Sequence, residues 1–592
     1  MSSMKRIDEY LAAFALMGMA LIPLIEIISR PMMGSGFENG PLVVQHLGLV
    51  MAMFGAIAAE RAGHLATLGR LIPAGQSFAY AFAGIVCGVL TWSSGHFVWT
   101  EMSSHNKLAY DVPVWWLQAM MPLGFLVLGF QLSMRSAQTY GLQLFNGLLV
   151  PLSGFLLARY FDGEVMPLWT SLLLLGVSLL CGAPIFAILG GLALTLFWSE
   201  GLPLASIALS HYQITVNPSL PALPLFTLAG LVFAKTGAAN RLGVVFIAVF
   251  GRGVLGTVIA AAVLCSFFTA FTGGSGVTIL ALGGLLLPLL RNAGYPEQRS
   301  ISLVTSASAL GVLFAPSIPL IMFAILARVP INTMFLAGLV PAILMIVCLL
   351  IFGGYLRVAG ENKNDSVSNT ELGLAIWRAK WEIFAPVVAI GSLVSGFATP
   401  TESAALTAIY AVLTQAFAHK ELNPRLLLAC LINCAQIIGG VMLILGMALG
   451  LTNYLVDAGI PDLAIEWVQG VTQNKYIFLF ALNVFLVIAA ALMEIYAAIV
   501  VLVPLLLPLA ISYGIDPIHF GIIFLSVMEM GFLCPPAGMN IFFASAVFNQ
   551  PIRKIASSVV PALIAIFVGT LLISWMPILS TGLPSLLAKD RM

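Results

Sequence analysis

Residues 271–278 read FTGGSGVT, and they stand between two strongly apolar stretches. The preceding stretch, VLGTVIAAAVLCSFFTA (254–270), and the following one, ILALGGLLLPLL (279–290), contain no charged residue. A water-exposed loop would carry charge nearby, and glycines weaken a plain membrane helix because they leave the backbone flexible. The stretch therefore predicts a break in the backbone inside apolar surroundings, and the rest of the chain decides what those surroundings are.

The composition predicts a polytopic membrane protein. Of 592 residues, 60% are apolar and only 8% are charged, whereas soluble domains carry about 25% charged residues. Many uncharged stretches have the length of a helix that crosses a bilayer, about twenty residues. The net charge of +1 gives no sign of nucleic-acid binding, and the chain has no GxxxxGK[ST] motif for a nucleotide. The seven cysteines show no CxxC or CxxH spacing, so we expect neither disulfides nor zinc.

The N-terminal part of the chain predicts five membrane spans. Lys5 and Arg6 precede the first apolar run without a small-residue cleavage site, so we expect a signal-anchor that is retained. With a cytoplasmic N-terminus, the inside segments hold five basic residues and the outside segments two, as the positive-inside rule requires. The expected spans lie at about 10–29, 41–59, 77–100, 113–134 and 141–158.

These spans predict two modules joined by one helix. We expect a small four-helix module over residues 1–140 and a large module over 167–592. Between them, residues 141–166 form a connecting transmembrane helix and a periplasmic link. The connecting helix brings the chain to the side of the membrane on which the large module begins.

An internal repeat becomes visible when the sequence is shifted by 220 residues. GVTILALGGLLLPLLRNAGY (276–295) then aligns with YAAIVVLVPLLLPLAISYGI (496–515), and GVLFAPSIPLIMFA (311–324) aligns with GFLCPPAGMNIFFA (531–544). Over 274–324, 15 of 51 aligned positions are identical. They include glycines and prolines, which apolar bias alone does not place in register, so we expect two structurally equivalent halves.

The two halves, about 220–356 and 380–577, share one predicted plan. A short break is followed by a helix ending in LLLPL and then by a span interrupted at APSIP (315–319) or PPAGMN (535–540). Proline and glycine inside a span leave backbone groups without helical partners, which costs several kcal/mol per group in lipid. Repeated halves with broken helices are typical of the binding site of a secondary transporter, where half-helix N-termini attract anions and C-termini coordinate sodium.

The motifs of both modules resemble a known transporter family. The large module resembles the large membrane subunit of tripartite ATP-independent periplasmic (TRAP) transporters, and residues 1–140, with HLATL (64–68), resemble the small four-helix subunit. The chain is therefore identified as a fused small-plus-large permease. The large-subunit motifs are LPALPLFTLAGLVFAKTGAANRL (220–242), FTGGSGVTILALGG (271–284), APSIPLI (315–321), ATPTESAALTAIYA (398–411) and CPPAGMNIFFA (534–544).

The resemblance implies a fold and a mechanism. It implies an all-α elevator-type transporter in which two re-entrant hairpins and two broken helices move against a scaffold that the small module extends. A separate periplasmic binding protein would deliver a small organic anion, usually a carboxylate, and sodium would drive uptake through two or more sodium sites. The protein would act as a monomer among the lipids of the bacterial inner membrane, without nucleotide, nucleic acid or enzymatic activity.

The first sodium site is expected where the FTGGSGVT tip meets the first proline break. Small residues at the tip would present backbone groups to the ion, although small residues also let membrane helices pack closely. The candidate sodium ligands are Gly273, Gly274, Ser275, Leu313, Pro316, Thr399, Thr401, Cys534 and Pro536.

The candidate substrate-binding residues are Ser275, Ser317, Glu494 and Asn540. Glu494 is an intramembrane carboxylate, a type of residue that is usually functional, although it could also reach a water-filled edge. The family commonly has Asp here. Facing an anionic substrate, Glu494 would bind a hydroxyl or amine or act through ions. Ser317 and Asn540 could reach a carboxylate, or they could satisfy backbone groups freed by the prolines.

Three further carboxylates lie in apolar surroundings. Glu402 could contact an ion, or it could complete a helix cap with the threonines at Thr399 and Thr401. For Glu529 we expect a structural partner within the bundle, and for Glu26 a scaffold contact.

Two other functions are compatible with parts of the sequence. A stand-alone ion-coupled anion carrier of similar hairpin architecture would need no separate small module. A polytopic membrane enzyme would need His, Asp or Cys residues gathered at one membrane face, and the histidines show no such spacing.

Overall fold

The structure is a computed structural model that describes residues 7–33, 38–65, 67, 72, 75–251, 253–357, 369–493, 495–535 and 538–589. Apart from two isolated β-bridges, the regular secondary structure of these residues is helical. Thirteen of the described helices are long and apolar enough to cross a membrane. The predicted all-α polytopic membrane fold is therefore confirmed. The chain divides into two compact units, which are described separately.

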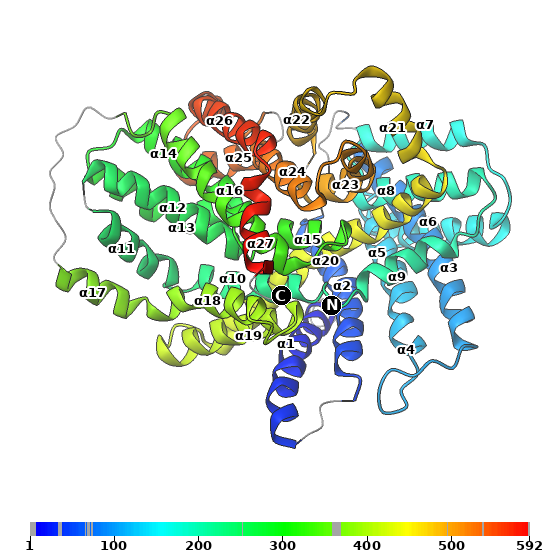
Figure 1. The fold of residues 1–592 in the computed structure, drawn as a ribbon. Coiled ribbons are helices and arrows are strands. Elements are labelled where there is room, and N and C mark those ends of the chain that lie inside the picture. The colour runs from blue at the N-terminus through cyan, green and yellow to red at the C-terminus, as the bar shows by residue number, and fades with distance from the viewer. Residues whose placement is uncertain are drawn as a thin grey trace. The chain divides into compact units, whose positions relative to one another are not determined.

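Unit 1 comprises residues 1–224 and 431–463. Helices stand at all five predicted spans, and α1 and α2 run side by side (Figure 1). The helices of this unit are α1 (Ile7–Met33), α2 (Gly40–Ala62), α3 (Gln76–Met102), α4 (Trp115–Gln118), α5 (Met120–Met134), α6 (Tyr140–Phe161), α7 (Leu168–Leu180), α8 (Ile185–Ser199), α9 (Ala205–Thr215) and most of α20 (Pro424–Asp457).

Within unit 1, the backbones of α2 and α20 touch each other. A Cβ atom added to Gly55 would overlap the carbonyl of Ala435, and one added to Gly439 would overlap the backbone of Gly55. Only glycine permits so close an approach, which is how small residues join membrane helices. Unit 1 thus contains the predicted small module and connecting helix together with later segments, and the division at residues 140 and 166 stays a prediction.

Unit 2 comprises residues 225–430 and 464–592. Its helices are α10 (Ala222–Lys235), α11 (Ala238–Phe250), α12 (Val254–Thr272), α13 (Ser275–Asn292), α14 (Glu297–Ala307), the 3₁₀ helix η3 (Ser308–Leu313), α15 (Ile318–Leu326), α16 (Ile331–Phe352), α17 (Asn369–Arg378), α18 (Lys380–Val394), α19 (Pro400–Leu413), the π-helix η4 (Thr414–Ala418), α21 (Ile460–Val471), α22 (Lys475–Leu492), α23 (Ile495–Ser512), α24 (Pro517–Gly531), α25 (Met539–Phe548), α26 (Ile552–Trp575) and α27 (Ile578–Lys589).

The predicted repeat is confirmed by the order of the helices in unit 2. The hairpin α12–α13 recurs as α22–α23, and the broken span made of α14, η3 and α15 recurs as α24 and α25. Corresponding helices begin 220 or 221 residues apart, as Ser275 and Ile495 do. The turn after each hairpin uses a glycine with positive φ, Gly294 at 88° and Gly514 at 68°, a conformation that glycine adopts without steric cost.

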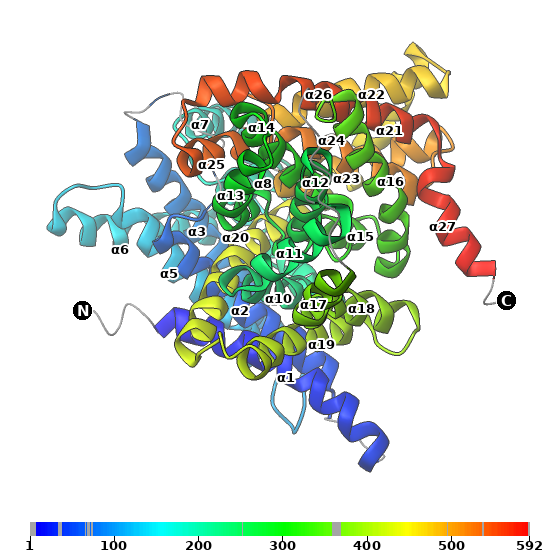
Figure 2. The same ribbon diagram turned by 90° about the vertical axis from the view of Figure 1, so that its left-hand side faces the viewer.

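The two repeats exchange their packing partners. The first arm of each hairpin packs on the broken span of its own repeat, α12 on α14 and η3, and α22 on α24. The second arms cross over, because α13 packs on α25 and α23 packs on α15. Figure 2 shows α25 beside α13. Each break therefore lies close to a hairpin of the other repeat.

A cluster of charged side chains anchors the start of unit 2. The helices α10 and α11 are bent by 79°, and after the bend Arg241 donates from Nε to Glu382 at 2.9 Å and from Nη1 to Glu421 at 2.7 Å. Burial opposes ionisation of Glu421, but hydrogen bonds from Arg241 and the Gly237 amide hold its pKa below the usual value. The cluster ties α11 to α18 and to the segment after η4.

Candidate functional site

The tip of the first hairpin is a two-glycine turn. Helix α12 ends at Thr272, Gly273 takes the left-handed conformation with φ 68°, and Gly274 is extended before α13 begins at Ser275. A Cβ atom on Gly273 would overlap the side chain of Ile318, the first residue of α15. Gly273 therefore permits both the left-handed turn and the close approach of the tip to the first proline break.

Ser275 and Asn540 connect the tip to the second break. Ser275 Oγ donates to Asn540 Oδ1 at 2.6 Å, and Asn540 Nδ2 donates to the carbonyl of Thr305 at 3.1 Å. Both side chains are buried, with exposed fractions of 2% and 0%. The structure thus brings together two of the predicted substrate-binding residues, and the two side chains are hydrogen-bonded to each other. Their contact with a substrate stays a prediction, and it requires this bond to open.

Further hydroxyl groups surround the tip. Tyr496, the second residue of α23, donates to the carbonyl of Gly273 at 2.6 Å. Thr269 donates to the carbonyl of Ser308 at 3.0 Å and lies 2.6 Å from the hydroxyl of Thr278. Sequence reasoning missed these residues, although a hydroxyl within an apolar run was a visible signal for Tyr496 and Thr269.

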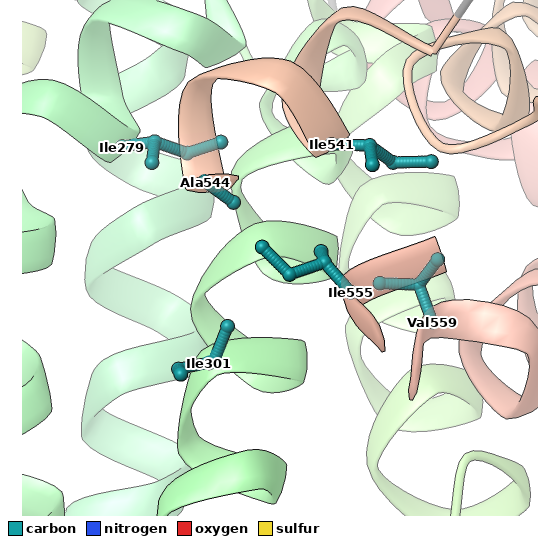
Figure 3. Close-up of a cluster of buried hydrophobic side chains, with 6 residues drawn as sticks. All are labelled: Ile279, Ile301, Ile541, Ala544, Ile555 and Val559. Carbon is teal, nitrogen blue, oxygen red and sulfur yellow. The ribbon is translucent and has the colours of Figure 1, made fainter. Parts of the chain in front are cut away.

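An apolar cluster joins the helices that carry Ser275 and Asn540 to two further helices (Figure 3). Its side chains come from α13, α14, α25 and α26 and are almost completely buried. Gly276 adds to this contact, because a Cβ atom there would overlap the ring of Phe543 on α25. Close packing therefore holds the tip in register with the second break. The cluster consists of Ile279, Ile301, Ile541, Ala544, Ile555 and Val559.

The first break is stabilised by its own side chain. Ser317 Oγ accepts from the amide of Leu320 at 3.4 Å, which caps α15, and it also donates to the carbonyl of Val312. Pro316 lies in the turn between η3 and α15, and Leu313 is buried with its carbonyl against Gly338 of α16. Ser317 thus satisfies backbone groups freed by the prolines, which is one of its two predicted roles.

The second break is described only in part. The backbone N–H of Asn540 donates across this break to the carbonyl of Phe532 at 3.0 Å. Cys534 is half-buried beside the break. Two predicted site residues, Pro536 and Glu494, lie outside the described residues. Their roles stay predictions.

Four half-helix N-termini meet at this place. Helices α13, α15, α23 and α25 begin at Ser275, Ile318, Ile495 and Met539. The contacts of Gly273 with Ile318 and Tyr496, and of Ser275 with Asn540, bring these four ends together. The sequence places no lysine or arginine within nine residues of any of the four. Each helix N-terminus carries a partial positive charge, so the four ends supply positive potential from the backbone.

Glu529 lies in the last turn of α24 and is completely buried. Neither of its carboxylate oxygens has a hydrogen-bond partner among the described residues, although the backbone of Leu313 interacts with it. Leu313 supplies a backbone interaction, and the expected structural partner for the carboxylate within the bundle stays a prediction. An isolated buried carboxylate is strongly unfavourable, so a proton or a cation must neutralise it.

Glu402 completes a helix cap. Thr399 caps α19, since its hydroxyl accepts from the amide of Glu402 at 3.3 Å, and Glu402 accepts from the amide of Thr399 at 2.8 Å. This reciprocal arrangement is a capping box. Helix α19, which also carries Thr401, packs mainly on α18 and η4. Sodium binding by these threonines stays a prediction.

Comparison with known proteins identifies a family match over most of the second module. Residues 172–579 match the family model described as "Tripartite ATP-independent periplasmic transporter, DctM component". This range contains both repeats and every residue of the site built above.

Several relatives are similar to this chain. The isethionate TRAP transporter permease protein DctMQ of Oleidesulfovibrio alaskensis is 33% identical over 67% of this chain, and the match spans 63% of that relative's length. The C4-dicarboxylate TRAP transporter large permease protein DctM of Rhodobacter capsulatus is 31% identical over 70% of this chain and 98% of its own length. A solved structure, the YdaH transporter of Alcanivorax borkumensis, matches with a TM-score of 0.40 and 15% identity, covering 60% of this chain and 86% of its own.

Proposed function

Because the chain belongs to the DctM family of tripartite ATP-independent periplasmic transporters, we propose that it imports a small organic anion, with a carboxylate as the expected group. Proteins of this family are permeases of the bacterial inner membrane that work with a periplasmic substrate-binding protein. The chain is a fused permease, with segments of both subunits in one polypeptide. We place its N-terminus in the cytoplasm, as the distribution of basic residues favours.

The meeting of four half-helix N-termini carries the proposal of an anionic substrate. Each N-terminus is equivalent to roughly half a positive charge, and in apolar surroundings this charge is weakly screened. A site without lysine or arginine attracts an anion and still allows it to leave, because no strong ion pair has to break. The names of the two relatives, which refer to isethionate and to C4-dicarboxylates, agree with an anion.

Two helix C-termini, one at the tip of the first hairpin and one at the first break, support coupling to sodium. Helices α12 and η3 end at Thr272 and Leu313, and their terminal carbonyls carry partial negative charge. Carbonyl and hydroxyl oxygens are suitable ligands for a hard cation. We propose sodium as the co-transported ion, bound where the tip residues Gly273, Gly274 and Ser275 meet the first break, with a second site at the other break.

We propose that the hairpins and broken helices move together with the substrate, as in an elevator. The exchanged packing supports this proposal, because α13 on α25 and α23 on α15 interlock the two repeats into one body. A bond such as that between Ser275 and Asn540 joins the repeats directly, so neither repeat is expected to move alone.

Uptake by purified protein in liposomes tests the proposal. The chain is reconstituted with its periplasmic binding protein and radiolabelled substrate, with an inward sodium gradient, with potassium instead of sodium, and without the binding protein. We expect uptake only when both sodium and the binding protein are present. Uptake that is indifferent to sodium would overturn the coupling. Uptake without the binding protein would identify the chain as a stand-alone carrier.

A further inference from the structure

A polar pocket lies in unit 1. It has a volume of about 390 Å³ and is formed by α2, α3, α4, α9 and the segment between α3 and α4. His46 and Gln118 are buried at its floor, with exposed fractions of 1% each, and Phe97, Glu101 and Tyr212 form its walls. None of the roles assigned to the hairpins uses this pocket.

A chain of hydrogen bonds fixes the orientation of the groups at the floor. His46 Nδ1 lies 2.8 Å from the carbonyl of Leu42, which can only accept, so this nitrogen carries the proton. A buried imidazole without a carboxylate partner is neutral, and Nε2 therefore accepts from the hydroxyl of Tyr212 at 2.9 Å. The side chain of Gln118 also interacts with the hydroxyl of Tyr212.

One hydrogen-bond acceptor at the floor has no partner. Gln118 lines the floor of the pocket, and its Oε1 is buried without a hydrogen-bond partner among the described residues. An unsatisfied buried acceptor is costly. The floor of the pocket therefore calls for a ligand that donates a hydrogen bond.

The walls add negative charge and aromatic faces. Glu101 Oε1 accepts from Ser104 Oγ at 2.9 Å and from Asn106 Nδ2 at 2.7 Å, which holds the carboxylate in place and leaves Oε2 for a ligand. Phe97 and Tyr212 stand with ring centroids 5.4 Å apart. A carboxylate, a free amide oxygen and two aromatic rings together favour a cation with several N–H donors.

Lys107 at the mouth does not reverse this preference. Its ammonium group lies 2.5 Å from Asp111 Oδ1, so the pair is neutral as a whole. Leu42, Val114 and Leu209 complete the lining with apolar side chains, which suit the methylene stem of a long basic side chain.

We propose that this pocket binds a lysine or arginine side chain of the periplasmic binding protein. The identity of the partner rests on the proposed function. The mouth is formed by exposed polar residues of the segment between α3 and α4, including Asn106 and Lys107. Three spans separate it from the N-terminus, so with a cytoplasmic N-terminus it opens to the periplasm. Its hydrophilic rim favours a protein side chain over a lipid headgroup, which would bring acyl chains with it.

The chemistry of the pocket is tested first with small molecules. The full chain is placed in nanodiscs of phosphatidylcholine and phosphatidylglycerol, which have no N–H donor, and saturation-transfer NMR follows n-butylguanidinium and its uncharged isostere n-butylurea. We expect saturable binding of n-butylguanidinium and a much weaker signal from n-butylurea. Glu101→Gln and Gln118→Leu should each weaken binding by roughly tenfold or more, as expected for loss of a hydrogen bond to a charged group. Glu164→Gln, an exposed carboxylate of the same unit, should leave it unchanged.

The partner is tested next with the binding protein itself. We expect its affinity for the nanodisc-held chain to fall by about tenfold in Glu101→Gln, and n-butylguanidinium to compete with it. Glu101 lies on a wall of the pocket and not in the core, so Glu101→Gln still tests the proposal if Gln118→Leu does not fold. Equal binding of n-butylguanidinium and n-butylurea would overturn the proposal.

Two other outcomes separate the possible failures. If phosphatidylethanolamine in the nanodisc displaces n-butylguanidinium and Glu101→Gln leaves the affinity for the binding protein unchanged, a lipid headgroup fills the pocket and the proposal is wrong. If the wild-type chain shows no affinity for the binding protein at all, the proposed function fails, whatever n-butylguanidinium does.

Discussion

The two crossed contacts between the repeats have the same architecture and different chemistry. Where α13 meets α25, Ser275 and Asn540 form a buried hydrogen bond. Where α23 meets α15, the equivalent positions under the 220-residue shift are Ile495 and Leu320, which cannot hydrogen bond. The repeat thus conserves the packing of helices, while the polar chemistry is concentrated in one of its two copies.

The hairpins also differ in their surroundings. Helix α12 is buried along almost its whole length, and its threonines bond to η3 and α13. Helix α22 exposes large apolar side chains, such as Ile477, Ile488 and Leu492, which suit a lipid environment. The difference indicates that polar bonds to both repeats hold the first tip. The described polar contact of the second tip is the bond from Tyr496 to the carbonyl of Gly273, so it runs to the first tip.

The largest expected effect is at the polar tip. Gly273→Ala forces a side chain into a left-handed conformation and into the space of Ile318, and we expect uptake to be lost. Gly514→Ala is the matched control, because Gly514 has the same φ of 68° with nothing close to its Cβ position. That variant should lose about 1 kcal/mol of stability and keep its uptake. Equal uptake by the two variants would show that the tip tolerates displacement.

A smaller effect is expected when the polar contact is made apolar. Asn540→Leu leaves the hydroxyl of Ser275 and the carbonyl of Thr305 without partners, at a cost of about 1–3 kcal/mol for each group. We expect a lower unfolding temperature and roughly tenfold slower uptake. The double variant Ser275→Ala/Asn540→Leu should recover part of the stability, since one of the two unsatisfied groups is gone. If the double variant also recovered full uptake, the pair would have no part in substrate binding.

The bond between the two hairpins is expected to matter less. Tyr496→Phe removes the hydroxyl that donates to the carbonyl of Gly273, worth about 0.5–1.5 kcal/mol. We expect the KM for substrate to rise by several-fold without loss of expression. Tyr476→Phe, on the exposed face of α22, serves as the control and should behave as wild type. An unchanged KM in Tyr496→Phe would mean that the two tips work independently.

The smallest effect on transport is expected at the cap of α19. Thr399→Ala removes the capping hydroxyl, which should lower stability by about 0.5–2 kcal/mol. The sodium dependence of uptake should remain that of the wild type, because the structure gives Thr399 the contacts of a cap. A raised sodium requirement in this variant would restore Thr399 to the ion site.

The sequence predicted those features that glycine and proline mark. The tip at FTGGSGVT, the first break at Pro316 and the repeat were visible because these residues disturb a helix wherever they stand. The capping box at Thr399 was visible as one of two readings, because its pattern is local.

Features that depend on distant neighbours were not predictable. Asn540 meets Ser275 across 265 residues, and nothing in either local sequence indicates that pairing. The surroundings of Glu529 depend on packing in space, so the sequence did not indicate that its carboxylate oxygens would be buried without a hydrogen-bond partner among the described residues. Gln118 gave no signal at all, since its place beside His46 and Tyr212 depends on how the helices of unit 1 pack.

The contact between Gly55 and Gly439 has a consequence for how such a permease can be encoded. Helices α2 and α20 are held together by close packing of their backbones at this glycine pair. This packing does not require that the two helices belong to one polypeptide. The helix α6 and its link to α7 then act as a tether that fixes stoichiometry and raises local concentration. Two open reading frames, divided within residues 162–167, should yield polypeptides that find each other in the membrane and co-purify.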